Sequence, residues 1–419
     1  MQTRKYTASA ILFLAVSGCA LQPVYQRPPA SVSASFPQGD AYKTPEKKDG
    51  HATAHASQLH WRDFLTDPRL QDLVELALKN NQDLRIASLN VDKVRAQYQL
   101  QRSALFPLVS LGSAASLKTS NITGPASTSP ASISRNYSAG LDVAWEADFF
   151  GRIHSLSDAA WNQYAASSYA RAAAQILLVS QVADQYLTTL AYDEQLDITR
   201  QLLQSAQASY KLAKLQFDVG TLSELDLSLN QTAVEQAQAN LAIQTRLRAQ
   251  AKNALVLLVG QALPASLPAP QNLAAQSMLT DIAEGLPSDL LARRPDILQA
   301  EATLRAENAD IGAARAAFFP QISLTGSFGT ASSTLGGLFA GGSGAWSFLP
   351  SLLLPIFDAG ANRANLDIAT VQKDIGVAQY QKAIQTAFRE VSDGLAARGT
   401  YVDQLVAQQR YTDAQKKRL

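Results

Sequence analysis

The chain has 419 residues, of which 47% are hydrophobic, and its 36 lysines and arginines nearly balance its 35 aspartates and glutamates. A formal charge of +1 gives no electrostatic basis for binding nucleic acid, so no such partner is expected. Cys19 is the single cysteine, which excludes an intrachain disulfide. After Cys19 no apolar run reaches the roughly 18 residues of a membrane helix, so any part that enters a membrane is expected to consist of strands.

Residues 1–18 have the form of a bacterial lipoprotein signal peptide. Two basic residues precede a short apolar run, and Val16-Ser17-Gly18-Cys19 matches the cleavage box of lipoproteins. Cleavage there makes Cys19 the first residue, carrying a covalent N-acyl diacylglyceryl lipid, and no other cofactor is expected. The alternative is an ordinary signal peptide that has a cysteine nearby. Residues 19–60 are then a lipidated N-terminal extension.

The sequence contains an internal duplication, which places a first repeat at 61–286 and a second at 287–419. Matching positions recur at an offset of 213 and then 209 residues: Asp83 with Asp296, Pro107 with Pro320, and Gly151 with Gly360. By the same offset the chain ends before the second repeat reaches its helical turn. We therefore expect a second repeat that is truncated by roughly fifty residues.

Each repeat has two segments in which polar and apolar residues alternate, and each pair predicts a strand hairpin. The predicted strands lie at about 108–117, 137–149, 321–330 and 346–357. Around Trp145 one face is apolar, whereas the opposite face carries Asp142, Glu146 and Asp148. A Ser/Thr/Pro-rich loop and a Gly-rich loop separate the strands of the two hairpins.

The other segments read as long helices. Residues 153–218 contain no proline and no glycine, and strong helix formers dominate them. Val219-Gly220-Thr221 then predicts the turn of a helical hairpin over about 152–259, with Thr221 or Ser223 as the cap of the returning helix. A second helix pair is expected to begin near Asn362, and by the repeat offset the chain stops before the returning helix of that pair. Many core-type positions are alanine, which suits closely packed, coiled-coil-like helices. The predicted fold class is therefore mainly α with membrane β.

Four strands with one apolar face cannot stand alone in a bilayer, because both sheet edges would leave backbone groups unpaired in hydrocarbon. Several copies are therefore expected to close one barrel. Asp142, Glu146 and Asp148 then face a water-filled lumen, where they add a weak preference for cations. The alternative is that these carboxylates are solvated strand residues near the membrane boundary.

The sequence resembles the TolC-like outer-membrane factors, and more closely the OprM-type, or NodT-type, lipoproteins of resistance-nodulation-division efflux systems. The resemblance covers nearly the whole chain and is most specific at residues 19–28, 61–64, 285–297, 318–322 and 354–358. It implies a homotrimer with a twelve-stranded outer-membrane β-barrel, four strands per chain, and an α-barrel of helical hairpins. The implied location is the outer membrane, with a lipid anchor and an extension into the periplasm.

The implied function is a passive exit duct for drugs or other small toxic compounds in a tripartite efflux pump. The implied partners are outer-membrane lipid, a periplasmic adaptor (membrane fusion) protein and an inner-membrane resistance-nodulation-division transporter. By the resemblance the hairpin tip contacts the adaptor and gates the duct, through Val219, Gly220, Thr221, Leu225 and Asp226. The tip is equally explained as a simple helix turn. Two other functions remain: an exit channel for type I protein secretion, and a non-conducting lipid-anchored envelope scaffold, which needs no barrel strands.

Two further motifs are interpreted as structural. His51, His55 and His60 invite a metal site, but their polar surroundings without periodicity favour a solvated linker. Arg293-Arg294-Pro295-Asp296 predicts a helix start with proline in the first turn. The sequence has no HExxH pair, no phosphate-binding glycine loop with lysine and no GxSxG elbow, so no enzymatic activity and no metal are expected.

Overall fold

The computed structural model describes residues 21–42, 54–55, 60–120, 132–276, 282–283, 291 and 293–418. Cys19, His51 and residues 285–290 and 292 of the 285–297 motif lie outside this part of the chain. Two compact units are present. Unit 1 comprises Met1–Ser31, Val91–Ser167 and Leu298–Ile384, and unit 2 comprises Val32–Asn90, Ser168–Ile297 and Gln385–Leu419. Each unit therefore combines segments from both sequence repeats.

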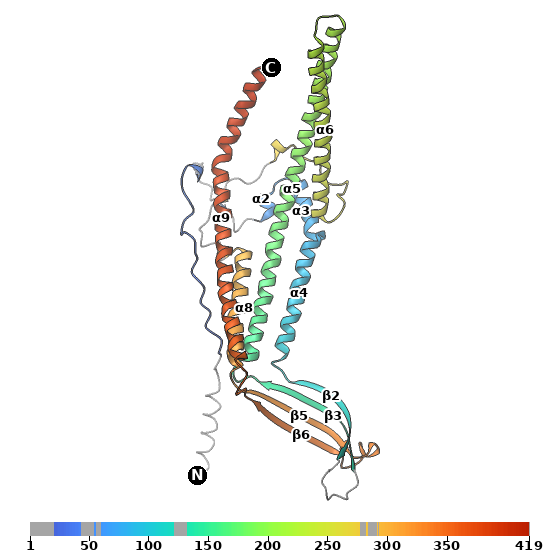
Figure 1. Ribbon diagram of the computed structural model, residues 1–419, viewed down its shortest axis with the longest axis vertical. Coiled ribbons are helices and arrows are strands. Elements are labelled where there is room, and N and C mark those ends of the chain that lie inside the picture. Colours follow the sequence, from blue (N-terminus) through green and yellow to red (C-terminus); the bar gives the residue numbers. More distant parts are fainter. Residues whose placement is uncertain are drawn as a thin grey trace. The chain divides into compact units, whose positions relative to one another are not determined.

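Unit 1 contains a four-stranded antiparallel sheet with the order β2-β3-β5-β6 (Figure 1). The strands are β2 (Leu108–Ser120), β3 (Ser132–Ala147), β5 (Gln321–Ser332) and β6 (Gly344–Leu353). Each repeat supplies one hairpin, and the pairing of β3 with β5 joins the two hairpins into one sheet. The four strands that the alternating pattern predicted are thus confirmed. A short 3-10 helix, η4 (Leu335–Gly337), lies between β5 and β6.

The two largest differences between the predicted and the observed strand ends have identifiable reasons. β3 begins at Ser132 rather than near 137, because its pairing with β2 continues to the end of that strand, where Ser132 faces Ser120. β6 ends at Leu353 rather than near 357, just before Leu354 and Pro355. Proline lacks the N–H group that a sheet ladder requires. Pro350, inside β6, is tolerated because β6 is an edge strand.

The helices of unit 1 pack through small and aromatic side chains. α8 (Pro295–Ala316) begins at the proline that the sequence predicted and lies beside α9 (Ala361–Arg418), where Gln372 Nε2 donates to Glu307 Oε1 over 2.9 Å. Tyr380 of α9 is fully buried. Ala159, Ala306 and Ala309 form a buried cluster between α5 and α8, which fits the predicted close packing of alanine-rich helices.

Unit 2 is built on a helical hairpin. α5 (Arg152–Asp218) has 67 residues, of which those from Ser168 belong to this unit, and α6 (Glu224–Val259) returns beside it. At ~1.5 Å per residue α5 measures on the order of 100 Å along its axis. The predicted hairpin is therefore present. α4 (Gln82–Ser103), like α5, has residues in both units.

The core of unit 2 forms where one face of α3 (Pro68–Asn80) meets α5 and α6. Leu73, Val74 and Ala77 of α3 are fully buried there, together with Val182 of α5 and Val259 of α6. The neighbouring elements are α2 (Trp61–Phe64), the 3-10 helices η1 (Asp40–Tyr42) and η3 (Leu273–Ala275), and a parallel pair of two-residue strands, β1 (Ala54–His55) and β4 (Ile282–Ala283). Among the described helices of the chain, none is both long and apolar enough to cross a bilayer.

Candidate channel wall and helical tip

The apolar face of the sheet carries large side chains that are exposed in the single chain. Residues that face each other across neighbouring strands share a face, because side chains alternate along each strand. One such row of the apolar face runs across all four strands: Leu111, Leu141, Phe328 and Trp346. Phe328 and Trp346 are 73% and 77% exposed. A band of exposed apolar side chains of this kind is what a membrane strand presents to lipid.

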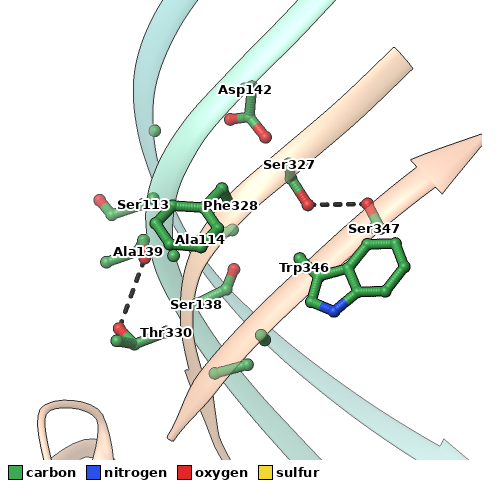
Figure 2. Close-up of a pocket in the computed structure, with 15 residues that line it drawn as sticks. Ser113, Ala114, Ser138, Ala139, Asp142, Ser327, Phe328, Thr330, Trp346 and Ser347 are labelled. Atoms are coloured by element: carbon green, nitrogen blue, oxygen red, sulfur yellow. Dashed lines mark hydrogen bonds between the residues drawn. The ribbon is translucent and has the colours of Figure 1, made fainter. Parts of the chain in front are cut away.

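The polar face of the sheet carries small and hydroxyl-bearing side chains. One row consists of Ser110, Asp142, Ser327 and Ser347, and the next consists of Gly112, Gly140, Gly329 and Ala345. The hydroxyls of Ser327 and Ser347 lie 2.7 Å apart and share a hydrogen bond, with Asp142 beside them (Figure 2). A hollow of about 330 Å³ lies here, and most residues that line it belong to the polar face. The sheet is therefore concave on its polar side.

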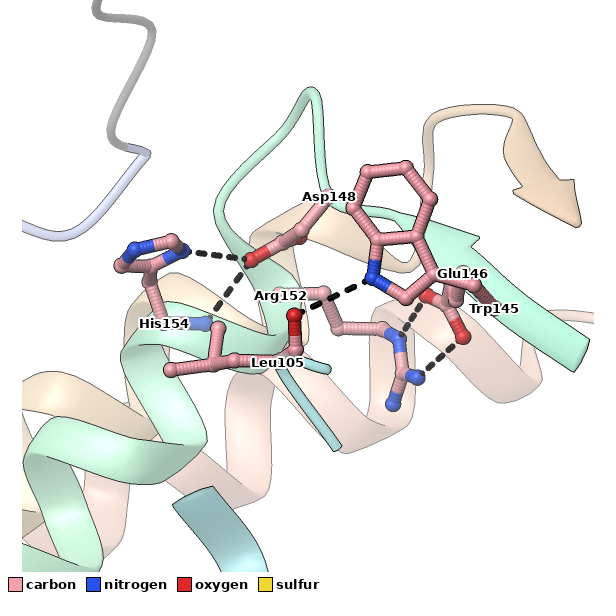
Figure 3. A network of polar contacts seen from close by, with 6 residues as sticks. All are labelled: Leu105, Trp145, Glu146, Asp148, Arg152 and His154. Carbon is pink, nitrogen blue, oxygen red and sulfur yellow. Dashed lines mark hydrogen bonds and ion pairs between the residues drawn. The ribbon is translucent and has the colours of Figure 1, made fainter. Parts of the chain in front are cut away.

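The three predicted lumen carboxylates have different surroundings. Asp142 lies in the middle of β3 on the polar face and is exposed. Glu146 lies on the same face, but Arg152 donates to both of its oxygens, over 3.0 and 2.7 Å (Figure 3). Asp148 lies beyond the end of β3, so strand alternation does not place its side chain. Sequence reasoning had assigned all three to a single strand face.

Asp148 accepts a hydrogen bond from the first turn of helix α5. Its Oδ2 accepts a hydrogen bond from the backbone N–H of His154 over 2.8 Å and lies 3.0 Å from His154 Nδ1 (Figure 3). Partial burial works to raise the pKa of Asp148, but hydrogen bonds from His154 and from neighbouring N–H groups lower it below the ordinary value. A carboxylate that receives the free N–H groups of a first helical turn is stabilised in its charged form.

Two contacts tie the junctions between strands and helices in unit 1. The indole Nε1 of Trp145 donates to the carbonyl oxygen of Leu105 over 3.1 Å, linking the end of β3 to the segment between α4 and β2 (Figure 3). The ring of Phe150 stacks on that of Phe319 with centroids 4.8 Å apart, linking the start of α5 to the segment before β5. The stacked rings thereby join a strand–helix junction of the first repeat to one of the second repeat.

The predicted helical tip lies in unit 2 and forms a capped turn. Gly220 has a φ of +75°, a left-handed conformation that glycine adopts without strain. Of the two predicted caps, Ser223 is the N-cap of α6, where its hydroxyl oxygen accepts from the N–H of Asp226 over 3.2 Å. Thr221 instead donates from its hydroxyl to the carbonyl oxygen of Gln216. The structure places Val219, Gly220 and Thr221 in the turn and Leu225 and Asp226 in the first turn of α6 that follows it.

A buried carboxylate that sequence reasoning missed holds the N-terminal segment on α8. The side chain of Glu301 is only 3% exposed. Its Oε2 accepts from Arg27 over 2.6 Å, and its Oε1 accepts from Arg305 over 2.8 Å and from the Tyr25 hydroxyl over 3.4 Å. Burial works to raise the pKa of Glu301, but these arginines lower it. The motif around Tyr25 and Arg27 was visible in the sequence, but nothing there indicated its partner.

The rest of this N-terminal segment follows α8 in the antiparallel direction. Asn308 Nδ2 donates to the carbonyl oxygen of Pro23 over 2.7 Å, and Arg315 donates to that of Leu21 over 3.2 Å. We call residues 21–27 the N-terminal strap. It lies along the helix from near its C-terminal end to Glu301.

The histidines of the linker are not brought together as metal ligands in the part of the chain described. His60 is the N-cap of α2, and its ring accepts from the N–H of Arg62. His55 lies in strand β1, and His51 falls outside the described residues. Across the described ranges no three His, Cys, Asp or Glu side chains are grouped as around a metal ion.

Comparison with known proteins identifies the family. The family model for outer membrane efflux proteins matches residues 73–261 and 286–419. The chain is 46% identical to the toluene efflux pump outer membrane protein TtgC of Pseudomonas putida, over 98% of this chain and 84% of TtgC. It is 45% identical to outer membrane protein OprJ of Pseudomonas aeruginosa, over 96% of this chain and 82% of OprJ.

The fold agrees with these sequence relations. The open state of the Neisseria gonorrhoeae MtrE outer membrane channel superimposes with a TM-score of 0.82 at 35% identity, covering 94% of this chain and 86% of MtrE. Long helices combined with a four-stranded sheet are thus the architecture of an outer-membrane channel subunit, as the sequence resemblance implied. The chain belongs to the outer membrane efflux protein family.

Proposed function

We propose that the chain is the outer-membrane channel of a tripartite efflux pump and acts as a passive exit duct. The observation that carries this proposal is the sheet of unit 1, which is apolar on one face and polar and concave on the other. The strand order leaves β2 and β6 as edges. Unpaired edges are too costly in hydrocarbon, so strands of further copies have to complete the wall.

In this proposal three copies supply four strands each to one closed barrel, and their polar faces together line a water-filled lumen. The apolar faces then contact the lipid of the outer membrane. The duct itself performs no chemistry and consumes no energy. Compounds move through it because the inner-membrane partner loads it from the other end.

The proposal assigns the helical tip to the contact with a periplasmic adaptor, which in turn engages an inner-membrane resistance-nodulation-division transporter. Val219 and Leu225 of the tip are 73% and 70% exposed, and exposed apolar side chains at the end of a hairpin favour contact with another protein. Replacing both residues with aspartate is expected to abolish efflux in cells but to leave the conductance of the purified trimer unchanged. Loss of conductance in this variant contradicts the assignment.

A lipid on Cys19 is part of the proposal and is supported by the Val16-Ser17-Gly18-Cys19 box. Such an anchor would retain the protein in the outer membrane with its helical part in the periplasm. Metabolic labelling with radioactive palmitate tests this directly. Labelling is expected in the wild type and lost in Cys19→Ser, and an unlabelled wild type excludes the anchor.

The substrate class proposed is small toxic organic compounds, including drugs. It is supported by the likeness to TtgC, which is named for toluene efflux. Recording in planar lipid bilayers tests the duct itself, and stable conductance from detergent-purified trimers is the expected result. A trimer that conducts no ions favours a non-conducting scaffold. Secretion of a protein substrate, with no change in drug sensitivity on deletion, favours type I secretion.

A further inference from the structure

We propose that Asp142 sets the charge preference of the strand-lined part of the duct, so that cations and cationic compounds are enriched there over anions. This inference rests on the proposed function, because it needs several copies to enclose a lumen. Of the three carboxylates that the sequence predicted to face the lumen, it assigns this role to Asp142 alone.

Asp142 lies on the concave side of the sheet. Its row contains Ser110, Ser327 and Ser347, all of which bear hydroxyls. Asp142 itself lines the hollow in Figure 2. The residues before and after it in β3, Leu141 and Val143, belong to the apolar face. In a closed wall the concave polar face is the inner one, because the apolar face must meet lipid. The carboxylate of Asp142 therefore points into the lumen.

The described strands carry only three other charged side chains, and none of them cancels Asp142. Glu146 is neutralised by the two hydrogen bonds from Arg152. Arg135 faces Leu117 on the apolar face. Lys118 shares the polar face, but it lies eight residues along β2 from Ser110, the residue opposite Asp142. At ~3.3 Å per residue that is roughly 26 Å, about three Debye lengths at physiological salt.

The immediate surroundings leave the carboxylate available to ions. The Ser327 and Ser347 hydroxyls bond each other rather than Asp142. A β-carbon built on Gly112 of the neighbouring strand would lie 2.7 Å from Asp142 Oδ2, so the carboxylate rests over a position without a side chain. The loop sequence between β2 and β3, residues 121–131, contains no charged residue. Each copy thus contributes one uncompensated negative charge at the same level of the wall.

A ring of such charges acts through water, so its effect depends on salt. The Debye length is about 8 Å at physiological ionic strength and about 3 Å at 1 M. At physiological ionic strength the field of the ring enriches cations in the lumen at the level of Asp142, whereas Lys118 lies beyond its reach. In concentrated salt it is confined to the wall. A cation preference that disappears as ionic strength rises is therefore the signature of this mechanism.

Reversal potentials in planar bilayers, under a KCl gradient centred near physiological ionic strength, measure the ratio of potassium to chloride permeability. The wild-type trimer is expected to prefer potassium, and Asp142→Asn is expected to lower the ratio by about twofold or more. Asp142→Glu, which retains the charge, should preserve the ratio. The matched control is the double variant Glu146→Gln with Arg152→Gln, which removes a neutral pair and should leave the ratio unchanged.

The outcomes separate this inference from the proposed function. An unchanged ratio in a conducting Asp142→Asn trimer overturns the role of Asp142 and leaves the duct intact. A control variant that shifts the ratio as much as Asp142→Asn overturns the role as well. Wild-type trimers that conduct nothing refute the duct itself. If Asp142→Asn fails to assemble, Ser110→Lys provides the second test, since a cation facing Asp142 must lower the ratio, and an unchanged ratio overturns the proposal.

Discussion

Glu301 is the residue on which the N-terminal strap depends. Its buried carboxylate receives hydrogen bonds from Arg27, Arg305 and Tyr25. Burial, together with the charge of this carboxylate, raises the pKa of Tyr25 to about 12. The partner of Arg27 lies 274 positions away in the sequence. Periodicity and motifs describe only near neighbours, so no pattern in the sequence predicts this contact.

Replacing Glu301 with glutamine is expected to release the strap. The two arginines lose their charged acceptor, but each is 47% exposed and regains water, so the expected loss is about 1–2 kcal/mol. Hydrogen exchange of the amides in residues 21–27 should quicken, as measured by mass spectrometry. The control is Asp393→Asn, which breaks an exposed pair with Arg389 and should change nothing. Unchanged protection of the strap in Glu301→Gln contradicts the role of Glu301.

The pH dependence of this contact has a definite sign. Because the pKa of Glu301 is lowered in the folded protein, its stabilising effect is present above the ordinary carboxyl value of 4.5. The effect is lost as pH falls through the folded value. Strap protection is therefore expected to weaken in acid.

Glu307, which also lies on α8, contributes to stability with the opposite dependence on pH. Its Oε1 accepts from Gln372, but its buried Oε2 has no hydrogen-bond partner in the described structure and lies against Gly376. Burial raises the pKa of Glu307. Its contribution to stability is therefore complete below the ordinary value of 4.5 and is lost as pH rises through the folded value.

Glu307→Gln is expected to stabilise the protein at neutral pH by on the order of 1 kcal/mol, because the uncharged amide no longer resists burial. Thermal unfolding followed by circular dichroism across a pH series measures this gain. The gain should shrink in acid, where the wild-type carboxyl is protonated. Asp374→Asn, an exposed position on α9, should show no such trend. Equal destabilisation of Glu307→Gln at every pH rejects the interpretation.

At the scale of elements, local sequence patterns predicted most of the strands and long helices that form. Alternation predicted four strands, and the long stretch without proline and glycine predicted α5 and α6 with their turn at Gly220. These signals succeed because strand and helix periods depend on neighbours two to four positions apart. Asp148 shows where such patterns fail to place a side chain. β3 ends one residue before it, and its carboxylate accepts a hydrogen bond from the first turn of α5 instead. The two-residue pair β1 and β4 left no periodic signal.

Two glycines at helix ends should respond differently to alanine, although both have a left-handed φ. Gly220 has open space around it, so Gly220→Ala is expected to cost about 1 kcal/mol, from backbone conformation alone. Gly260 ends α6, where a β-carbon would lie 2.4 Å from the Asn80 carbonyl oxygen. Gly260→Ala should therefore cost more than about 2 kcal/mol. Chemical denaturation measures both, and equal costs contradict the crowding at Gly260.

At the scale of the whole molecule, the family and its efflux role were predicted from the sequence and agree with the relatives. The sequence also predicted one polar and one apolar sheet face. It did not reveal which charges on the polar face are neutralised, because the ion pair of Glu146 with Arg152 crosses from a strand into a helix. Such a pair depends on the angle at which the two elements meet.

Adjacent residues of β5 test the two faces in the assembled channel. Phe328→Lys places a charge on the apolar face and is expected to cost roughly 2–4 kcal/mol near the bilayer centre, reducing trimers in the outer membrane. Ser327→Lys places the same charge on the polar face and should be tolerated. Trimer yield on semi-denaturing gels measures both. Similar yields from the two variants contradict the assignment of the faces.

The strap also determines which length changes the N-terminal region can accept. Leu21 and Pro23 contact α8 through their carbonyl oxygens, Tyr25 and Arg27 contact it through their side chains, and Gln22 lies close to Gly312 of the same helix. Inserting or deleting one or two residues within the strap would move some of these contacts out of register with α8, because each residue of an extended chain advances the path by ~3.3 Å. Related proteins that vary in length in this region are therefore expected to do so beyond Arg27 rather than inside the strap.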